Sequence, residues 1–500
     1  MKADNPQVSI FRPAFLLMTG RTIGFVATFM LPIVLVRVFS QAEFGTYKQL
    51  FLIYSTLYGM AQLGMAESLY YFVPMAPRSG GRYATNAILI LAGTGIACLT
   101  ILWGGSGIIG GWFNNPELGH YLPLIGVFLI FMLISAVLEI LMISRKQHSL
   151  AFKAYVFSDI GRTALCLLPA LIFQTLEWLL VGLIAFGASR LLVTFLYVGK
   201  QFRNGLGVEH RLMEKHLQYA LPFAVAVIID LLQSNLHFYI VSSRIDAATF
   251  AIYAIGCLQI PLVDFMMSST GNVMMVRMSE DIRDGNTRMT VNTWRDTTRK
   301  LALIFVPLVA VLIVTAHNLI PGLFTASYSG SVPLFMVWSL MMLLAVFLTD
   351  GVLRVFADTR FIIALNLLKL AIIALLINAF LTGMGLIGAV AVTLLAGFAA
   401  KSVALVRIRR LMQCSWRNLL PWKSLSIVVG IAMTAALPTV ALESFVRFPH
   451  LIAALAAAIG YSAVYALLVW RYGPLTEEER TDILHFLSRP LLRLNRIVRN

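Results

Sequence analysis

The sequence predicts an all-α membrane protein that crosses the bilayer about fourteen times. Three observations predict this fold class: the composition, the length of the apolar segments and the placement of the positive charges. Hydrophobic residues make up 59% of the 500 residues and charged residues only 12%, whereas about 25% of a typical soluble domain is charged. A soluble protein with so few polar side chains could not cover its surface. Lipid is therefore the expected solvent for most of the chain.

The apolar segments have the length of membrane spans, since a helix needs roughly 20 apolar residues to cross the hydrocarbon core. Fourteen segments meet this requirement: 13–39, 49–76, 84–110, 121–143, 155–173, 178–199, 217–242, 250–276, 301–320, 332–353, 361–381, 386–406, 424–441 and 450–470. Only the short stretch from Gln174 to Glu177 separates the fifth and sixth. The first is too long for a signal peptide and no small-residue cleavage site follows it, so we expect it to be retained.

The positive charges predict the orientation. With the N-terminus in the cytoplasm, thirty of the 39 Lys and Arg residues fall on the cytoplasmic side. The opposite face holds four of them: Arg37, Lys48, Arg244 and Arg447. Such a bias marks the cytoplasmic side, so we expect an even number of spans, both termini inside, and the bacterial inner membrane as the location. It also explains the net charge of +16 without nucleic acid as a partner, because basic loops face anionic headgroups.

The expected spans divide into two lobes of six helices, residues 1–205 and 206–410, followed by two extra spans in 411–472 and a cytoplasmic tail in 473–500. In the tail, Thr476 followed by three glutamates is typical of a capping box. The apolar and basic residues after it favour an amphipathic helix on the inner leaflet.

A weak internal repeat supports two lobes. Phe44-Gly-Thr-Tyr47 stands at the outer end of the second span, and Phe250-Ala-Ile-Tyr253 stands at the same point of the eighth. Internal repeats of this kind are common in secondary transporters.

Several segments resemble a known family. Arg37-Val-Phe-Ser-Gln-Ala-Glu-Phe-Gly-Thr-Tyr47, followed by a helix with Gly59, Gly64, Glu67 and Ser68, resembles the start of a Wzx-type polysaccharide flippase. This is the polysaccharide transporter branch of the multidrug/oligosaccharidyl-lipid/polysaccharide (MOP) exporter superfamily. Other similar segments are Asp246-Ala-Ala-Thr-Phe-Ala-Ile-Tyr253, Asp358-Thr-Arg360 and Gly383-Met-Gly-Leu-Ile-Gly388.

The resemblance covers most of residues 10–410 through short motifs. It implies two six-helix lobes around a central cavity, alternating access, and a polyprenyl-pyrophosphate-linked oligosaccharide as cargo. The product would serve O-antigen, capsule or exopolysaccharide synthesis. The implied partners are that cargo, membrane lipids, and a polysaccharide polymerase with its chain-length proteins.

Enzyme signatures are missing from the sequence. Gly383-x-Gly-x-x-Gly388 matches the dinucleotide fingerprint only formally, because no strand precedes it, and a turn is expected instead. There is no phosphate-binding loop, no Asp-x-Asp pair and no His/Cys cluster with zinc spacing. We therefore expect a transporter with no catalytic residues, no cofactor and no metal. The alternatives are a drug, cation or lipid II exporter of the same superfamily and, in another class, a sugar polymerase or ligase, which typically needs a large outer loop.

Two carboxylates near the bilayer midplane are the candidates for ion coupling. Asp230 and Asp264 lie near the centres of the seventh and eighth spans. Asp230 is followed at helical spacing by Gln233, Ser234 and His237, which places four polar side chains on one helix face. Such a face must look into protein or water. It predicts either a proton or sodium site, with His237 as a further candidate, or hydrogen bonds to sugar hydroxyls, or a buried structural network.

Anionic cargo requires cations, and arginine suits phosphate because of its forked donors. Arg21 and Lys369 lie at similar depths in spans one and eleven, and Arg190 in span six is a further candidate. Glu67 is either a partner of Arg21 in the empty state or its permanent ion-pair partner. At the outer mouth the candidates are Arg37, Lys48 and Arg244. Tyrosines line span two and fit either sugar stacking or the membrane interface: Tyr54, Tyr58, Tyr70 and Tyr71.

The other intramembrane charges have structural explanations. Asp159 and Arg162 are expected to pair, and Asp350 has Arg354 one turn further on. Glu139, Lys401 and Asp350 are expected to reach the cytoplasmic interface by snorkelling.

Overall fold

The structure is a computed structural model in which the described residues are 29–203, 205–445, 449–481 and 485. Within them the regular structure consists of α-helices and two short 3-10 helices, with no strand. The predicted all-α class is confirmed. Arg21 and most of the predicted tail helix lie outside the described residues.

A short helix, Phe29–Val38, precedes the first ten labelled helices. Their bounds are α2 Gln41–Ala61, α3 Met65–Met75, α4 Gly80–Gly104, α5 Ser106–Trp112, α6 Pro116–Ser135, α7 Val137–Ser144, α8 His148–Phe173, α9 Leu176–Gln201, α10 His210–Ser242 and α11 Ala247–Gly256. The later helices are α12 Pro261–Arg283, α13 Thr287–Phe324, η1 Ala326–Tyr328, α14 Ser331–Ser339, η2 Leu340–Val346, α15 Thr349–Val355, α16 Thr359–Leu411, α17 Trp416–Leu419, α18 Trp422–Phe445 and α19 His450–Tyr472.

Ten helical stretches among the described residues are long and apolar enough to cross a membrane. The chain is therefore a multi-pass membrane protein. The second expected span is divided into α2 and α3, the eighth into α11 and α12, and the eleventh and twelfth are joined in α16. Most of the first lies outside the described residues, so the number fourteen stays a prediction.

The glycine-rich motif at 383–388 forms a sharp turn inside α16. Gly385 has φ +61° and ψ −147°, a conformation that only glycine adopts without strain. A Cβ on Gly388 would lie 2.0 Å from the carbonyl oxygen of Phe380, so the chain returns closely upon itself. The turn predicted for this motif is confirmed.

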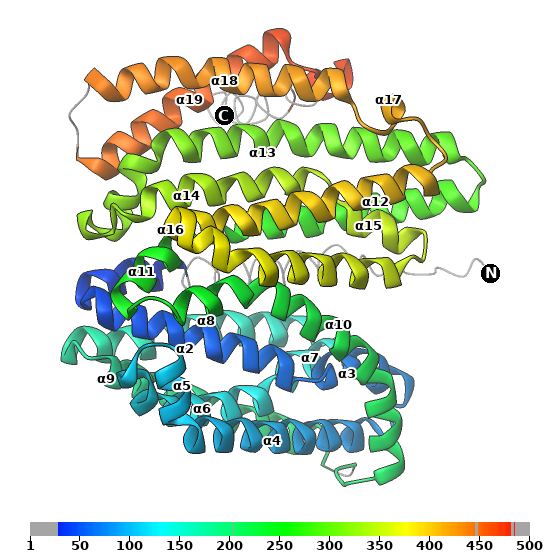
Figure 1. The fold of residues 1–500 in the computed structure, drawn as a ribbon. Coiled ribbons are helices and arrows are strands. Elements are labelled where there is room, and N and C mark those ends of the chain that lie inside the picture. Colours follow the sequence, from blue (N-terminus) through cyan, green and yellow to red (C-terminus); the bar gives the residue numbers. More distant parts are fainter. Residues whose placement is uncertain (1–28, 204, 446–448, 482–484, 486–500) are drawn as a thin grey trace, which may run out of the picture. The chain divides into compact units, whose positions relative to one another are not determined.

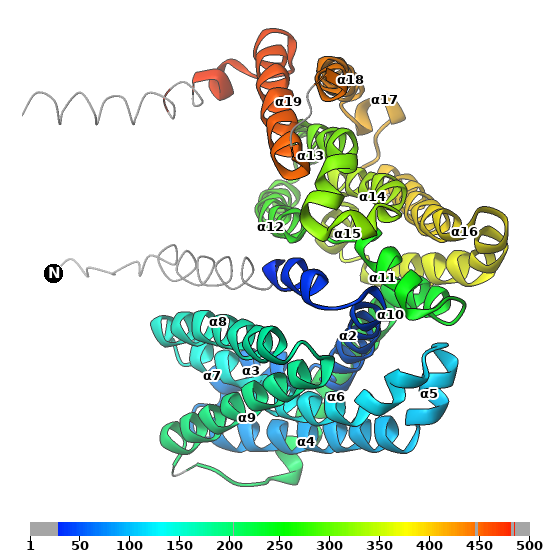
Figure 2. The same ribbon diagram turned by 90° about the vertical axis from the view of Figure 1, so that its left-hand side faces the viewer.

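The chain packs as two compact units. The first comprises the described part of Met1–Ile255 together with Asn366–Val392, and the second comprises that of Gly256–Leu365 and Thr393–Asn500. In the first unit α4 packs on α6, and α9 packs on both α6 and α8 (Figure 2). In the second, α13, α18 and α19 lie side by side (Figure 1). The predicted lobe boundaries at residues 205, 410 and 472 stay a prediction.

The two repeated motifs meet inside the first unit. Ser40 caps α2 through a capping box with Glu43, and Asp246 accepts a hydrogen bond from the Thr249 amide at 2.7 Å at the start of α11. A Cβ on Gly45 would lie 1.7 Å from the carbonyl oxygen of Ala247. The motif therefore contains glycine because α2 and the start of α11 touch backbone to backbone at this point.

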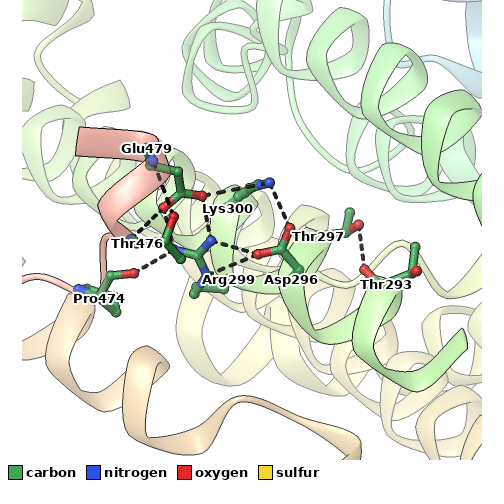
Figure 3. A network of polar contacts seen from close by, with 8 residues as sticks. All are labelled: Thr293, Asp296, Thr297, Arg299, Lys300, Pro474, Thr476 and Glu479. Carbon is green, nitrogen blue, oxygen red and sulfur yellow. Dashed lines mark hydrogen bonds and ion pairs between the residues drawn. The ribbon is translucent and has the colours of Figure 1, made fainter. Parts of the chain in front are cut away.

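A polar network fastens the chain after α19 to α13 (Figure 3). Arg299 has a side chain only 9% exposed and contacts Asp296 at 2.6 Å. Its Nη1 also donates to Glu479 Oε2 at 2.9 Å. Glu479 in turn accepts from the Thr476 amide at 3.0 Å, and Thr476 Oγ1 accepts from the Glu479 amide. The predicted capping box of Thr476 and Glu479 is confirmed. The ion pair with the buried Arg299 also holds the Glu479 side chain in place.

This network predicts an acid-sensitive stability. Hydrogen bonding to the Arg299 guanidinium lowers the pKa of the Glu479 carboxyl from 4.5 to about 2. A carboxyl with a depressed folded-state pKa stabilises the protein above its unfolded pKa, and this contribution is lost as the pH falls toward the folded value. In thermal unfolding of the detergent-solubilised protein, wild type should lose stability as the pH falls from 4.5 to about 2. Glu479→Gln should show a smaller loss over this range. The exposed neighbour Glu478 supplies the control, since Glu478→Gln should leave the wild-type profile unchanged; an identical flattening in both variants would contradict the assignment.

Candidate functional site

A polar face on α10 is the centre of the candidate site. Gln233 Nε2 donates to Asp230 Oδ1 at 3.1 Å and to Ser234 Oγ at 2.6 Å. Gln233 is buried, whereas Asp230 and Ser234 are exposed. The helical spacing seen in the sequence thus becomes a connected row that presents a carboxylate outward from the helix.

A second helix of the same unit completes this site. Asn366 Nδ2 on α16 donates to Asp230 Oδ1 at 3.3 Å. Lys369 follows Asn366 by three residues, which places it on the same side of α16. The structure therefore brings the predicted coupling carboxylate and one predicted cargo cation onto a single pair of helices, α10 and α16.

The chemistry of this pair suits a small cation or a proton. Asp230 supplies a carboxylate, and the side chains of Asn366 and Gln233 each carry an oxygen besides the amide donor. Hard monovalent and divalent cations prefer oxygen ligands. Among the described residues there is no group of three or more His, Cys, Asp or Glu that could hold a transition metal.

The other two coupling candidates lie apart from Asp230 in their contacts. His237 is fully buried, and its Nδ1 is 2.7 Å from the hydroxyl of Tyr253, so it joins α10 to the repeated motif on α11. Asp264 lies in the first turn of α12 and is exposed. It belongs to the second unit, whereas Asp230 belongs to the first.

Arg190 forms a buried ion pair. Its Nη2 contacts Glu139 Oε2 at 2.6 Å, with side-chain exposures of 12% and 5%, and its Nη1 donates to Ser158 Oγ. The expectation that Glu139 snorkels to the interface is wrong, because α7, α8 and α9 enclose it and supply its counter-charge. Glu139 Oε1 and Arg190 Nε have no hydrogen-bond partner among the described residues.

The remaining charged residues form local contacts. The predicted pair of Asp159 and Arg162 is confirmed, at 3.3 Å. Asp350 forms an ion pair with Lys401 at 3.7 Å, and Lys401 also donates to Thr349 Oγ1 at 2.8 Å, so Lys401 is bound within its own unit rather than reaching out to the interface.

The three predicted outer-mouth cations lie near the helix starts of the repeated motifs. Arg37 is exposed and donates to the carbonyl of Ile33. Lys48 lies over the ring of Phe44, 5.4 Å from its centroid. Arg244 is exposed just before the cap of α11.

A cavity of about 380 Å³ lies between the α2–α3 break and α10. Its lining includes Glu67, Ser68, Gly59 and Gly64 from the family-like segment. Gln62 and Tyr219 also line it, and no sequence pattern singled them out. The four tyrosines of span two have different surroundings. Tyr54 stacks on Tyr58 and Phe128, whereas Tyr71 stacks on Tyr219 beside the cavity and Tyr70 is exposed.

A family model described as polysaccharide biosynthesis protein matches residues 34–333, and no curated protein matches the sequence. The fold is similar to that of the lipid II flippase MurJ in an inward closed conformation, with a TM-score of 0.69, 12% identity, and coverage of 92% of this chain and 99% of that one.

Two transporters of the MOP superfamily also share the fold. For an inward-facing multidrug resistance MATE family transporter the TM-score is 0.63, with 13% identity and coverage of 79% of this chain and 96% of that one. For a MOP superfamily transporter from Pyrococcus furiosus the TM-score is 0.57, with 13% identity and coverage of 80% and 96%. Since the family model covers more than half of the chain and the fold agrees with the motifs that resemble Wzx, this membrane protein belongs to the polysaccharide biosynthesis protein family and has the fold of the MOP superfamily.

Proposed function

We propose that this chain flips a polyprenyl-pyrophosphate-linked oligosaccharide from the cytoplasmic to the outer leaflet of the bacterial inner membrane. The observation that carries the proposal is the match of residues 34–333 to a polysaccharide biosynthesis family, on a fold found in a lipid II flippase. The glycan would become part of an O-antigen, capsule or exopolysaccharide, assembled by a polymerase and chain-length proteins outside.

The mechanism we propose is alternating access without covalent chemistry. Lys369 and Arg21 hold the pyrophosphate, and the polyprenyl chain stays in lipid. A proton or sodium ion at Asp230 changes the charge of the α10 face, and this charge biases which side of the transporter is open. Asp264 is a second candidate for the same role.

Depletion in cells separates this function from drug export. In a strain that makes the polysaccharide, loss of the chain should accumulate lipid-linked oligosaccharide that an impermeant reagent cannot reach from outside. Greater sensitivity to cationic drugs with unchanged lipid-linked oligosaccharide would instead favour the drug exporter. A polymerase or ligase defect would leave the oligosaccharide on the outer leaflet, where the reagent modifies it.

Orientation is tested by single cysteines in loops that the structure leaves accessible. With the native cysteines replaced, Asn114→Cys and Ser329→Cys should react with an impermeant thiol reagent from outside. Ser79→Cys and Asn286→Cys should react only after the membrane is opened, because cytoplasmic loops carry the positive charge. The reverse pattern would overturn the proposed placement of both termini in the cytoplasm.

Removing the cargo cations should stop export without removing the protein. Lys369→Ala and Arg21→Ala should each lower transport at least roughly tenfold, since a hydrogen bond to a charged group contributes about 1.5–3 kcal/mol. Arg21→Lys should restore only part, because an ammonium cannot reproduce bidentate phosphate binding. Lys200→Ala, at the exposed end of α9, is the control. Loss of the protein from the membrane in both alanine variants would mean that these cations are structural.

A further inference from the structure

We propose that the cavity between the α2–α3 break and α10 binds one uncharged sugar ring of the cargo. This inference rests on the proposed function, because it assigns a subsite to the glycan of a lipid-linked oligosaccharide. The cavity of about 380 Å³ falls within the range of small-molecule sites, about 300–1,000 Å³.

A break in the second expected span builds this cavity. Leu63 and Gly64 both have positive φ, +47° and +67°, so α2 ends and α3 starts in a new direction. A Cβ on Gly64 would lie 3.2 Å from the carbonyl oxygen of Ala220 on α10. The two elements therefore approach closely at the break, and the small lining residues Gly59 and Ala224 leave space beside it. Discontinuous membrane helices commonly form substrate sites in transporters.

Three polar side chains face this space with complementary hydrogen-bonding capacity. Glu67 is exposed in the first turn of α3, and no described residue forms a hydrogen bond or ion pair with its carboxylate. Ser68 is fixed from behind, since its hydroxyl donates to the carbonyl of Met65 at 2.9 Å and contacts His216 Nε2. Gln62 adds an amide that both donates and accepts. A carboxylate can accept from two neighbouring hydroxyls at once, which is the arrangement that a sugar ring offers.

An aromatic wall on α10 also borders the cavity. Tyr219 and Phe223 line the cavity, and Tyr219 is held in place by a parallel stack on Tyr71, with centroids 5.0 Å apart and an interplanar angle of 9°. An aromatic face carries partial negative charge and so attracts the partly positive C–H groups of a sugar ring. The ring of Tyr219 would therefore receive one face of the sugar while Glu67 and Gln62 bind its hydroxyls.

The charge of the lining restricts which part of the cargo fits. Among the described residues that line the cavity, Glu67 is the one that is charged. A pyrophosphate or a uronic acid would stand beside a carboxylate in a partly dehydrated space, where like charges repel strongly. The bound sugar is therefore uncharged, and the pyrophosphate binds outside this lining, at the proposed cargo cations Lys369 and Arg21.

The test measures glycoside binding to the full-length chain in detergent micelles by saturation-transfer NMR. The probes are methyl glycosides of glucose, galactose and N-acetylglucosamine, with methyl glucuronide and choline for comparison. At least one neutral glycoside should bind, and Glu67→Ala should weaken it roughly tenfold, as expected for loss of hydrogen bonds to a charged group. Methyl glucuronide should bind wild type more weakly than the neutral glycosides and should gain affinity in Glu67→Gln.

Two further variants guard against misfolding and non-specific effects. Val227 lines the cavity and is 47% exposed, so Val227→Trp should block glycoside binding without disturbing a packed core. Glu117→Ala, at the exposed start of α6, should bind like wild type. Unchanged glycoside binding in both Glu67→Ala and Val227→Trp would overturn the proposal, as would displacement of the glycosides by choline, because Glu67 and the aromatic wall would then form a cation site.

Transport of the lipid-linked cargo in vesicles separates this inference from the proposed function. If wild type moves the cargo and Glu67→Ala moves it equally fast with unchanged glycoside binding, the sugar subsite is wrong and the function stands. If wild type binds glycosides through Glu67 and moves no lipid-linked oligosaccharide, the proposed function is wrong and the sugar cavity stands.

Discussion

Asp230→Asn is expected to remove the response of transport to an ion gradient while leaving cargo binding intact. The substitution keeps the shape and the hydrogen-bonding partners Gln233 and Asn366 but removes the charge that would attract a proton or sodium ion. Without that charge the α10 face no longer changes state when an ion arrives, and a ligand shifts an equilibrium only through its differential affinity for the two states.

The measurement uses vesicles with an imposed proton or sodium gradient. With the gradient imposed, Asp230→Asn should transport only as fast as wild type does when no gradient is present. The control Asp284→Asn, at an exposed position, should respond to the gradient as wild type does. Asp264→Asn tests the second candidate in the same assay. If both Asp230→Asn and Asp264→Asn respond to the gradient as wild type does, the polar face of α10 is a structural network and the coupling site lies elsewhere.

Arg190→Met is expected to destabilise the protein strongly. It leaves the Glu139 carboxylate buried without its counter-charge, and breaking a buried pair by removing one partner typically costs about 3–5 kcal/mol. The double variant Arg190→Met, Glu139→Leu should recover most of this loss, because an apolar pair of similar volume often replaces a buried ion pair without a penalty.

The control is an ion pair within a single helix, α8, of the same unit. Arg162 and Asp159 have side chains 31% and 27% exposed, so Arg162→Met should cost only about 0–1 kcal/mol. Unfolding of the purified variants in micelles gives these differences. An Arg190→Met protein with wild-type stability and impaired cargo binding would instead return Arg190 to the cargo site.

The fold class was predictable because lipid solvation constrains the sequence at every span. Hydropathy located apolar segments that are helical in the described part of the chain, and the glycines from Gly383 to Gly388 located the turn in α16. The breaks in the second and eighth spans were not predicted. Gly64 beside Leu63 and Pro261 at the start of α12 are residue types common at helix ends, but they lie inside otherwise continuous apolar segments.

The candidate site was predictable only within one helix. Periodicity placed Asp230 and Gln233 on one face, but Asn366 lies 136 residues away in the chain and has no local signal. The same limit explains the wrong expectation for Glu139. Its position within the span could be predicted from the sequence, but its partner Arg190, 51 residues away, could not. Contacts between helices that are distant in the sequence depend on tertiary packing, so they cannot be predicted from single segments.

The proposed flippase activity is tested directly by following the leaflet position of a lipid-linked oligosaccharide. The purified chain is reconstituted into vesicles with a short-chain polyprenyl-pyrophosphate oligosaccharide in the inner leaflet, and an impermeant sugar oxidase outside reports each molecule that crosses. If the chain is a flippase, oxidation should require wild-type protein, respond to an ion gradient and fall to the protein-free rate with Lys369→Ala. Oxidation at the protein-free rate with wild type, together with uptake of a cationic drug by the same vesicles, would contradict the proposed flippase activity.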